Sequence, residues 1–334
     1  HTWKTTDNSQ HTQSPPNALI VSVSVFEAKN DWLFTPAIAM ETGKAYKVSF
    51  YIKTNGQNEK LRVYMGNDAT VEAMGETPVL DLGEFNHTQY QKKEAIITVP
   101  ANSNYTIGFH AYSLRNSDNI YIDDFSLVEL TEPDIAVENI ISPKDIIYTG
   151  KHDITATIKN MGGTTLTALD IQYTIGESAP AIHNWTGSLA PGQTAEVTVA
   201  SQIDMETEGE LEIKVNALLT GDINPTDNTA TKSINVYAPK KIPYTENFDG
   251  VTAPALPEVW SIEDYNGSSQ WKTTIVAAKS APNGLGIETN AARDDWAFTP
   301  MIRLEAGKNY NLQFFCRSRM NNQVENIRAY IGNA

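Results

Sequence analysis

The sequence contains a single cysteine, Cys316, so no disulfide bond can form within the chain. The apolar stretch 312–316 around it predicts a strand, and a buried structural thiol is the simplest role for the cysteine. Apolar runs long enough to cross a membrane as a helix are also missing. Stability must therefore come from packed cores, and we expect no membrane insertion.

Basic residues are scarce, because 25 Lys and Arg stand against 40 Asp and Glu and leave a net charge of −15. Such a chain repels a phosphate backbone, so we expect no nucleic-acid partner. The surplus of carboxylates suits either a soluble surface or the binding of divalent cations.

Catalytic motifs are missing as well. The six histidines are scattered without the i, i+4 pair of a zinc helix, and no Gly-x-Ser-x-Gly elbow or phosphate-binding loop occurs. A pair of distant carboxylates, as in a glycosidase, stays compatible with the sequence. We nevertheless predict that the chain is not an enzyme.

Helical periodicity is almost absent, whereas alternation of apolar and polar residues is common. Residues 45–53 alternate as a half-buried strand does, and residues 120–130 are apolar on both faces, as in a strand within a core. Clusters of Asn, Gly, Asp and Pro separate these segments and supply turns. The pattern predicts an all-β protein built from sandwiches of antiparallel sheets.

Two boundaries divide the chain. The motifs change near Pro133, and a short proline-bounded linker follows Ala238. Residues 132–238 contain about seven short strands, the number typical of an immunoglobulin-like sandwich. We predict three domains, which are residues 1–131, 132–238 and 239–334.

The two outer domains share a motif. Asp31-Trp32-Leu33-Phe34-Thr35-Pro36 returns as Asp295-Trp296-Ala297-Phe298-Thr299-Pro300. Further matches flank the motif, and they are Trp3–Thr6 with Trp271–Thr274, Gly43–Tyr46 with Gly307–Tyr310, and Met65–Asn67 with Ile331–Asn333. A repeat at this spacing predicts two copies of one domain. Only the second copy has a lead-in over residues 242–270 and only the first has a tail over residues 69–130, so we expect both copies to be incomplete.

The outer domains resemble the cleaved-adhesin or choice-of-anchor J family, which consists of MAM-like jelly-roll modules of secreted and surface proteins of Bacteroidetes. The residues that carry this resemblance are Ile242–Asp249, Leu256–Trp260, Trp271, the Asp295–Pro300 motif and Ile120–Leu127. The middle domain resembles CARDB modules, which are associated with bacterial adhesion, through Asn160–Gly163, Leu189–Gly192 and Asn224–Asn228. The expected fold is thus two partial jelly rolls separated by an immunoglobulin-like sandwich.

The resemblance implies a structural calcium ion, which binds six to eight oxygen atoms. Candidate ligands are Glu246, Asp249 and Asp295 in the second copy, and Asp31, Asp123 and Asp124 in the first. The alternative is that Asp249 caps a turn and that Asp31 and Asp295 cap strand ends.

The recurring tryptophans have different expected roles. Trp32 and Trp296 lie between an acid and an apolar run, which favours a place in the core. Trp3 and Trp271 lie in polar surroundings and are candidates for ligand binding, with packing at the rim as the alternative.

These features predict a non-enzymatic adhesion or ligand-binding protein that is secreted or lies on a bacterial cell surface. Its expected partner is a host or cell-surface protein or a glycan. The alternative is a substrate- or carbohydrate-binding accessory region of a secreted peptidase or glycoside hydrolase. The oligomeric state does not follow from the sequence.

Overall fold

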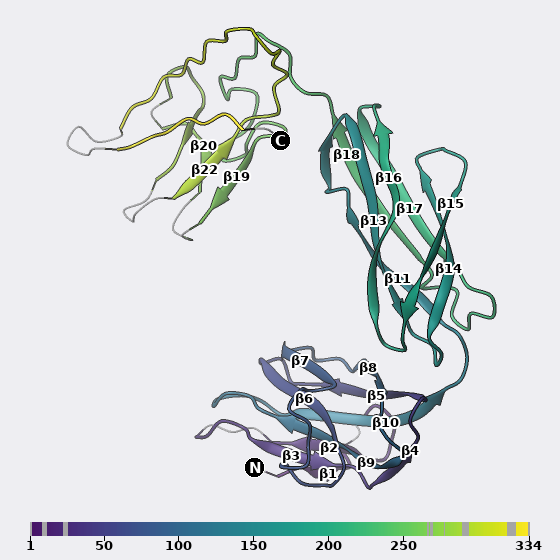
Figure 1. The fold of residues 1–334 in the computed structure, drawn as a ribbon. Helices are drawn as coiled ribbons and strands as arrows, with labels where there is room; N and C mark the ends of the chain where they lie inside the picture. Colours follow the sequence, from purple (N-terminus) through teal and green to yellow (C-terminus); the bar gives the residue numbers. More distant parts are fainter. Residues whose placement is uncertain are drawn as a thin grey trace. The chain divides into compact units, whose positions relative to one another are not determined.

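The structure is a computed structural model that describes residues 2–8, 12–22, 26–265, 267, 270–276, 278–288, 294–318 and 325–332. Every regular element in these ranges is a β-strand (Figure 1), as the sequence predicts. The described residues include no helix that could cross a membrane. Asn333, His1 and His11 lie outside the described residues.

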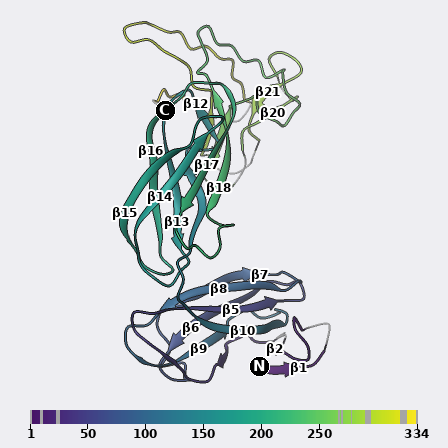
Figure 2. The same cartoon turned by 90° about the vertical axis from the view of Figure 1, so that its right-hand side faces the viewer.

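The described residues between 4 and 130 form a sandwich of two antiparallel sheets (Figures 1 and 2). One sheet has the strand order β1-β2-β10-β5-β8, and the other has the order β3-β9-β6-β7 with β4 also paired to β9. The strands are β1 (Lys4–Thr6), β2 (Ala18–Val21), β3 (Asp31–Phe34), β4 (Ile38–Met40), β5 (Ala45–Lys53), β6 (Glu59–Gly66), β7 (Leu80–Phe85), β8 (Gln91–Thr98), β9 (Ser103–Ala111) and β10 (Ile120–Leu130).

The core of this first sandwich lies between the two sheets. Val48, Phe50 and Ile52 on β5 face Leu61 and Val63 on β6, and all five are fully buried. The bounds of β5 and β10 match the predicted strands 45–53 and 120–130, because alternation and apolar content fix such long strands well.

The middle of the chain forms a second sandwich. Its sheets have the orders β11-β13-β16 and β12-β18-β17-β14-β15, with β12 parallel to β18. The strands are β11 (Ile135–Ser142), β12 (Ile146–Tyr148), β13 (Gly150–Asn160), β14 (Leu166–Ile175), β15 (Ala181–Leu189), β16 (Thr194–Met205), β17 (Gly209–Leu218) and β18 (Thr229–Tyr237). This sandwich has one strand more than the seven expected from the sequence, and the additional strand is the short β12.

The remaining part of the chain has less regular structure. The described residues after 239 contain β19 (Ser261–Asp264) paired with β22 (Asp295–Phe298), and β20 (Lys272–Thr274) paired with β21 (Gly284–Gly286). The predicted strand at 312–316 is wrong, since these residues lie outside any strand, and Cys316 is exposed rather than buried. Apolar alternation produces a strand only where a neighbouring strand completes its hydrogen bonds.

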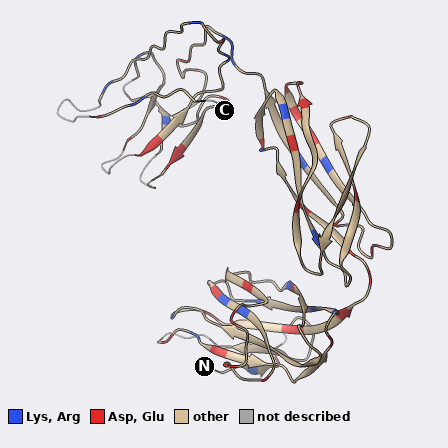
Figure 3. Ribbon diagram, in the orientation of Figure 1, with Lys and Arg blue, Asp and Glu red and all other residues tan. Residues whose placement is uncertain are grey.

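The chain divides into two compact units, the first with residues 1–142, 153–201 and 212–232 and the second with residues 143–152, 202–211 and 233–334. This division passes through the middle sandwich, so the domain ends at 131 and 238 stay predictions. Acidic and basic residues are interspersed along the strands (Figure 3), so the net negative charge is not gathered into one block.

The matching segments of the sequence make matching contacts. The indole nitrogen of Trp3 donates to the carbonyl of Asp31 at 3.3 Å, and that of Trp271 donates to the carbonyl of Asp295 at 3.1 Å. Strand β1 pairs with β2 as β20 pairs with β21. The hydroxyl of Tyr46 accepts a hydrogen bond from the amide of Glu41 at 2.8 Å, and that of Tyr310 accepts one from Glu305 at 2.8 Å.

Candidate ligand-binding face

Strand β6 has two chemically different faces. Leu61 and Val63 are fully buried against the core, whereas Arg62 and Tyr64, which alternate with them, are half-buried and point to the other side of the sheet. The sheet β3-β9-β6-β7 therefore covers the core with one face and presents a polar and aromatic set of side chains on the other.

The neighbouring strands supply the same kind of side chain. Trp32 on β3 lies opposite His110 on β9, and His110 lies opposite Arg62 on β6. We name this outer surface the aromatic face; it consists of Trp32, Phe34, Arg62, Tyr64, His110 and Tyr112. None of the six side chains is fully buried.

The rings of the aromatic face stack on one another. The Trp32 ring lies 4.3 Å from His110 at 6° and 5.8 Å from Phe34 at 12°. Tyr64 lies 5.2 Å from Trp32 at 42°, and Tyr112 lies 5.7 Å from His110 at 32°. Such contacts hold each ring in place, since aromatic pairs gain about 0.5–1.5 kcal/mol beyond the burial of their area.

Gly108 makes room for this stack. A Cβ atom at this position would lie 2.8 Å from the sulfur of Met74 and 3.2 Å from the nearest ring atom of Phe34. Only glycine lets both side chains approach the backbone of β9 so closely.

The guanidinium group of Arg62 is fixed in place. Its Nε donates to Asp81 at 2.8 Å, the Tyr112 hydroxyl donates to the same carboxylate at 2.9 Å, and the guanidinium carbon lies 4.2 Å from the centre of the Tyr112 ring. Burial raises the pKa of Asp81, but hydrogen bonds from Gly83, Arg62 and Tyr112 outweigh it, so the pKa lies below its usual range. Arg62 and Asp81 are thus both charged at neutral pH, and their charges cancel.

His110 adds no charge to the aromatic face at neutral pH. Burial and then the nearby Arg62 lower the pKa of His110, while Asp31 opposes them. One ring nitrogen lies 2.8 Å from the side-chain oxygen of Asn30, which precedes β3.

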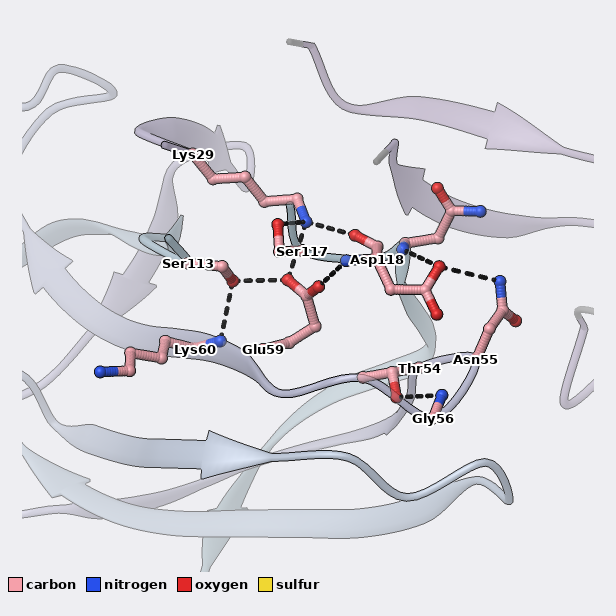
Figure 4. A network of polar contacts seen from close by, with 10 residues as sticks. Lys29, Thr54, Asn55, Gly56, Glu59, Lys60, Ser113, Ser117 and Asp118 are labelled. Atoms are coloured by element: carbon pink, nitrogen blue, oxygen red, sulfur yellow. Dashed lines mark hydrogen bonds and ion pairs between the residues drawn. The ribbon is translucent and has the colours of Figure 1, made fainter. Parts of the chain in front are cut away.

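A buried ion pair fixes the start of β3. Lys29 Nζ lies 2.7 Å from Glu59 Oε2, and both side chains are fully buried (Figure 4). The ammonium group also donates to Ser117 Oγ at 2.7 Å and to the carbonyl of Asp118. The Glu59 carboxylate accepts further hydrogen bonds from the Ser113 hydroxyl and the Asp118 amide.

This network joins segments that lie far apart in the sequence. Lys29 lies between β2 and β3, Glu59 begins β6, and Ser113, Ser117 and Asp118 belong to the connection from β9 to β10. Because Lys29 is three residues from Trp32, the ion pair sets where β3 enters the sheet that carries the aromatic face.

Replacing Lys29 with methionine should destabilise the chain by about 3 to 5 kcal/mol, because it leaves the Glu59 carboxylate buried without its cation. Urea unfolding of the Lys29→Met variant measures this loss. The double variant Lys29→Met with Glu59→Leu should recover most of the stability, since it removes both charges. Equal losses in the single and double variants would contradict this role of the ion pair.

The predicted acids of the first copy lie on two different sheets. Asp31 begins β3 and is buried, whereas Asp123 and Asp124 lie at an irregularity of β10. Asp123 Oδ2 accepts the amides of Gln13 at 2.7 Å and Ser14 at 3.1 Å, and Asp124 accepts the Ser14 hydroxyl. Asp123 and Asp124 therefore hold the loop before β2.

The acids of the second copy lie apart as well. Glu246 accepts the amide of Phe248 at 2.7 Å, and Asp249 accepts the amide of Asn283 at 3.1 Å beside a cleft of about 500 Å³ that it helps to line. Asp295 begins β22. The described residues contain no group of three or more His, Cys, Asp and Glu side chains that could hold a metal ion.

The oxygen atoms around Asn283 are held by its own N–H groups. Its side-chain nitrogen lies 3.0 Å from the carbonyl of Phe248 and 2.6 Å from that of Val251, and its backbone nitrogen bonds to Asp249. These oxygen atoms accept the N–H groups of Asn283, so a cation among them would have to displace this residue.

The structure allows the positions of three tryptophans to be compared with the roles expected from the sequence. The core position predicted for Trp32 is wrong, because alternation along β3 directs Leu33 to the core and Trp32 to the aromatic face. Trp3 packs against the first core and Trp271 is half-buried, and each donates its indole hydrogen to a carbonyl. The sequence did not single out His110, Arg62 and Tyr112, although the alternation of β6 around Arg62 and Tyr64 is a usable signal.

A second polar cluster lies in the middle sandwich. Burial, then Asp227 and Asp222, raise the pKa of Asp134 to about 6, and Lys47 opposes them. Within the described part of the chain, Asp134 Oδ1, Asp227 Oδ1 and Asn228 Oδ1 are buried and make no hydrogen bond.

Asp134→Asn should be more stable than the natural chain at pH 7, by at most about 3 kcal/mol. The raised pKa means that protonation of Asp134 stabilises the fold below pH 3.8 and that this stabilisation is lost as the pH rises through about 6. Unfolding free energies of both proteins from pH 4 to 8 should therefore diverge with rising pH. A constant difference would contradict the assignment.

Comparisons with known proteins agree with part of the expected organisation. Residues 132–232 match the family model CARDB, which confirms a CARDB domain in the middle of the chain. No curated protein matches the chain.

Solved structures similar to the chain are distant. A CARDB domain from Pyrococcus furiosus in complex with di-metal ions is 23% identical, with 32% of this chain and 96% of that chain covered and a TM-score of 0.27. The K3 cleaved adhesin domain of Lys-gingipain from Porphyromonas gingivalis is 12% identical, with 38% of this chain and 91% of that chain covered and a TM-score of 0.29. A carbohydrate-binding module of family 4 is 16% identical, with 38% of this chain and 94% of that chain covered and a TM-score of 0.29. TM-scores this low carry no argument about function.

Proposed function

We propose that the chain is a non-catalytic adhesion or ligand-binding protein, secreted or on the cell surface, whose first sandwich presents the aromatic face to a ligand. The supporting observation is the stack of half-buried rings beside an arginine that is held by Asp81 and Tyr112. Tryptophan, tyrosine and arginine are the residues that carry most binding energy at protein interfaces.

The rigidity of the aromatic face supports the same function. Its side chains come from paired strands and, for Tyr112, from the residue after β9. They stack on each other, and Arg62 makes a charge-assisted hydrogen bond. A ligand would therefore bind without first ordering these side chains, which keeps the entropic cost of binding low. The CARDB domain and the second copy would then act as further modules of the same adhesion protein.

Arg62→Ala should weaken binding to cells about tenfold or more, since it removes a donor and a stacking partner at the centre of the aromatic face. Flow cytometry of epithelial cells with the fluorescently labelled full chain measures the binding. Lys92→Ala is the matched control, because Lys92 forms an exposed ion pair with Glu94 on β8 of the opposite sheet. Equal binding by Arg62→Ala and the natural chain, or no binding by either, would overturn the proposed function.

The proposal includes the structural calcium ion that the family resemblance implies, with Glu246 and Asp249 as its candidate ligands in the second copy. Removing calcium with EGTA should lower the melting temperature of the full chain by several degrees. Asp249→Asn should abolish this response, whereas Asp68→Asn in an exposed turn should keep it. An EGTA-independent melt of the natural chain would eliminate the ion from the proposal.

A further inference from the structure

The outward side chains of the aromatic face recur in the second copy. Trp296 and Phe298 stand 264 residues after their counterparts (296 − 32 and 298 − 34), and Arg328 and Tyr330 stand 266 residues after theirs (328 − 62 and 330 − 64). The matched pairs are Trp32 with Trp296, Phe34 with Phe298, Arg62 with Arg328, and Tyr64 with Tyr330.

The rings also take the same relative positions. Trp296 lies 5.9 Å from Phe298 at 9°, against 5.8 Å and 12° for Trp32 and Phe34. It lies 5.3 Å from Tyr330 at 37°, against 5.2 Å and 42° for Trp32 and Tyr64. The second copy therefore builds the same stack of three rings.

The residues that alternate with this set are not identical. Leu33, Leu61 and Val63 face the first core, and Ala297, Ile327 and Ala329 occupy the matching positions. Apolar packing tolerates exchange among aliphatic residues as long as the volume can be filled. Packing of the core places no requirement on the outward side chains. Because the same four residue types nevertheless occur at the outward positions of both copies, they indicate a common function of the outer surface.

The chemistry of the aromatic face selects the class of ligand. Arg62 is neutralised by Asp81, His110 has a lowered pKa, and the whole chain carries a net charge of −15, so a polyanion is disfavoured. Aromatic rings provide apolar contact for the C–H surface of a sugar ring, and Arg62, Asp81 and Asn30 provide donors and acceptors for hydroxyl groups. A neutral carbohydrate satisfies both requirements.

We propose that the chain carries two related neutral-glycan sites, one around Trp32 and Arg62 and the other around Trp296 and Arg328, which share three rings and an arginine, whereas Asp81, His110 and Tyr112 belong to the first site alone. This inference rests on the proposed function, because it gives the ligand class of the same aromatic face and adds a second site. Two sites on one chain bind a polysaccharide with an avidity that can exceed either affinity by a factor of about 10² to 10⁴.

The first experiment identifies the glycan. Electrophoresis of the full chain through gels that contain mannan, xylan or mixed-linkage β-glucan should show retardation by at least one of the three. Polygalacturonate is the acidic comparison and should retard the chain less. Retardation by polygalacturonate alone, or by none of the four polysaccharides, overturns the assignment of a neutral glycan.

The second experiment counts the sites. Calorimetric titration with the hexasaccharide of the retarding polysaccharide should give two sites per chain, one site in Arg62→Ala or Arg328→Ala, and none in the double variant. Each single variant should also lose at least tenfold in affinity for the intact polysaccharide, because avidity is lost. Lys92→Ala should keep two sites, and circular dichroism checks that each variant is folded.

The outcomes separate this inference from the proposed function. One site in the natural chain, or an unchanged count in Arg328→Ala, overturns the second site. If Arg328→Ala does not fold, Arg328→Lys replaces it in the titration, since lysine keeps the positive charge but lacks the planar fork of donors. Cell binding that depends on Arg62 without retardation by any neutral polysaccharide would reject the glycan and leave the adhesion function standing.

Discussion

The alternation of side chains along a strand is the constraint on which the rest of the first sandwich depends. Strands β3, β9 and β6 of the sheet β3-β9-β6-β7 direct alternate residues to the core and to the aromatic face. Leu61 and Val63 therefore cannot be buried without placing Arg62 and Tyr64 outside. A slip of one residue would exchange the two sets, so the packing energy of the core also holds the aromatic face in register.

The buried ion pair between Lys29 and Glu59 adds a second constraint at the edge of this sheet. Two fully buried charges are stable only because the surrounding hydroxyls, amide and carbonyl satisfy them. The pair joins the segment before β3 to the start of β6, and these are the strands that bear Trp32 and Arg62. Stability of the sandwich and geometry of the candidate site thus have the same origin.

The sequence predicted the β-class and strands β5 and β10, because long alternating segments are local signals. The CARDB domain was expected from the resemblance that its turn motifs carry. It did not predict the aromatic face. Tyr64, His110 and Tyr112 come together only through the pairing of β6 with β9, and the pairing register is not written in either strand alone. The core position predicted for Trp32 was wrong for a related reason. Its neighbours in the sequence indicated burial, but the pairing of β3 with β9 places its side chain on the aromatic face. Cys316 shows the converse, where an apolar alternating segment lies outside any strand.

The most direct test of the central claim follows the indole N–H signals of the six tryptophans in a nitrogen-15 spectrum of the full chain. On addition of the neutral hexasaccharide, the signals of Trp32 and Trp296 should shift, while that of Trp3, whose N–H is bonded to the Asp31 carbonyl, should stay in place. Shifts confined to Trp185 in the middle sandwich or to Trp3 would contradict the assignment of the aromatic face as the binding surface.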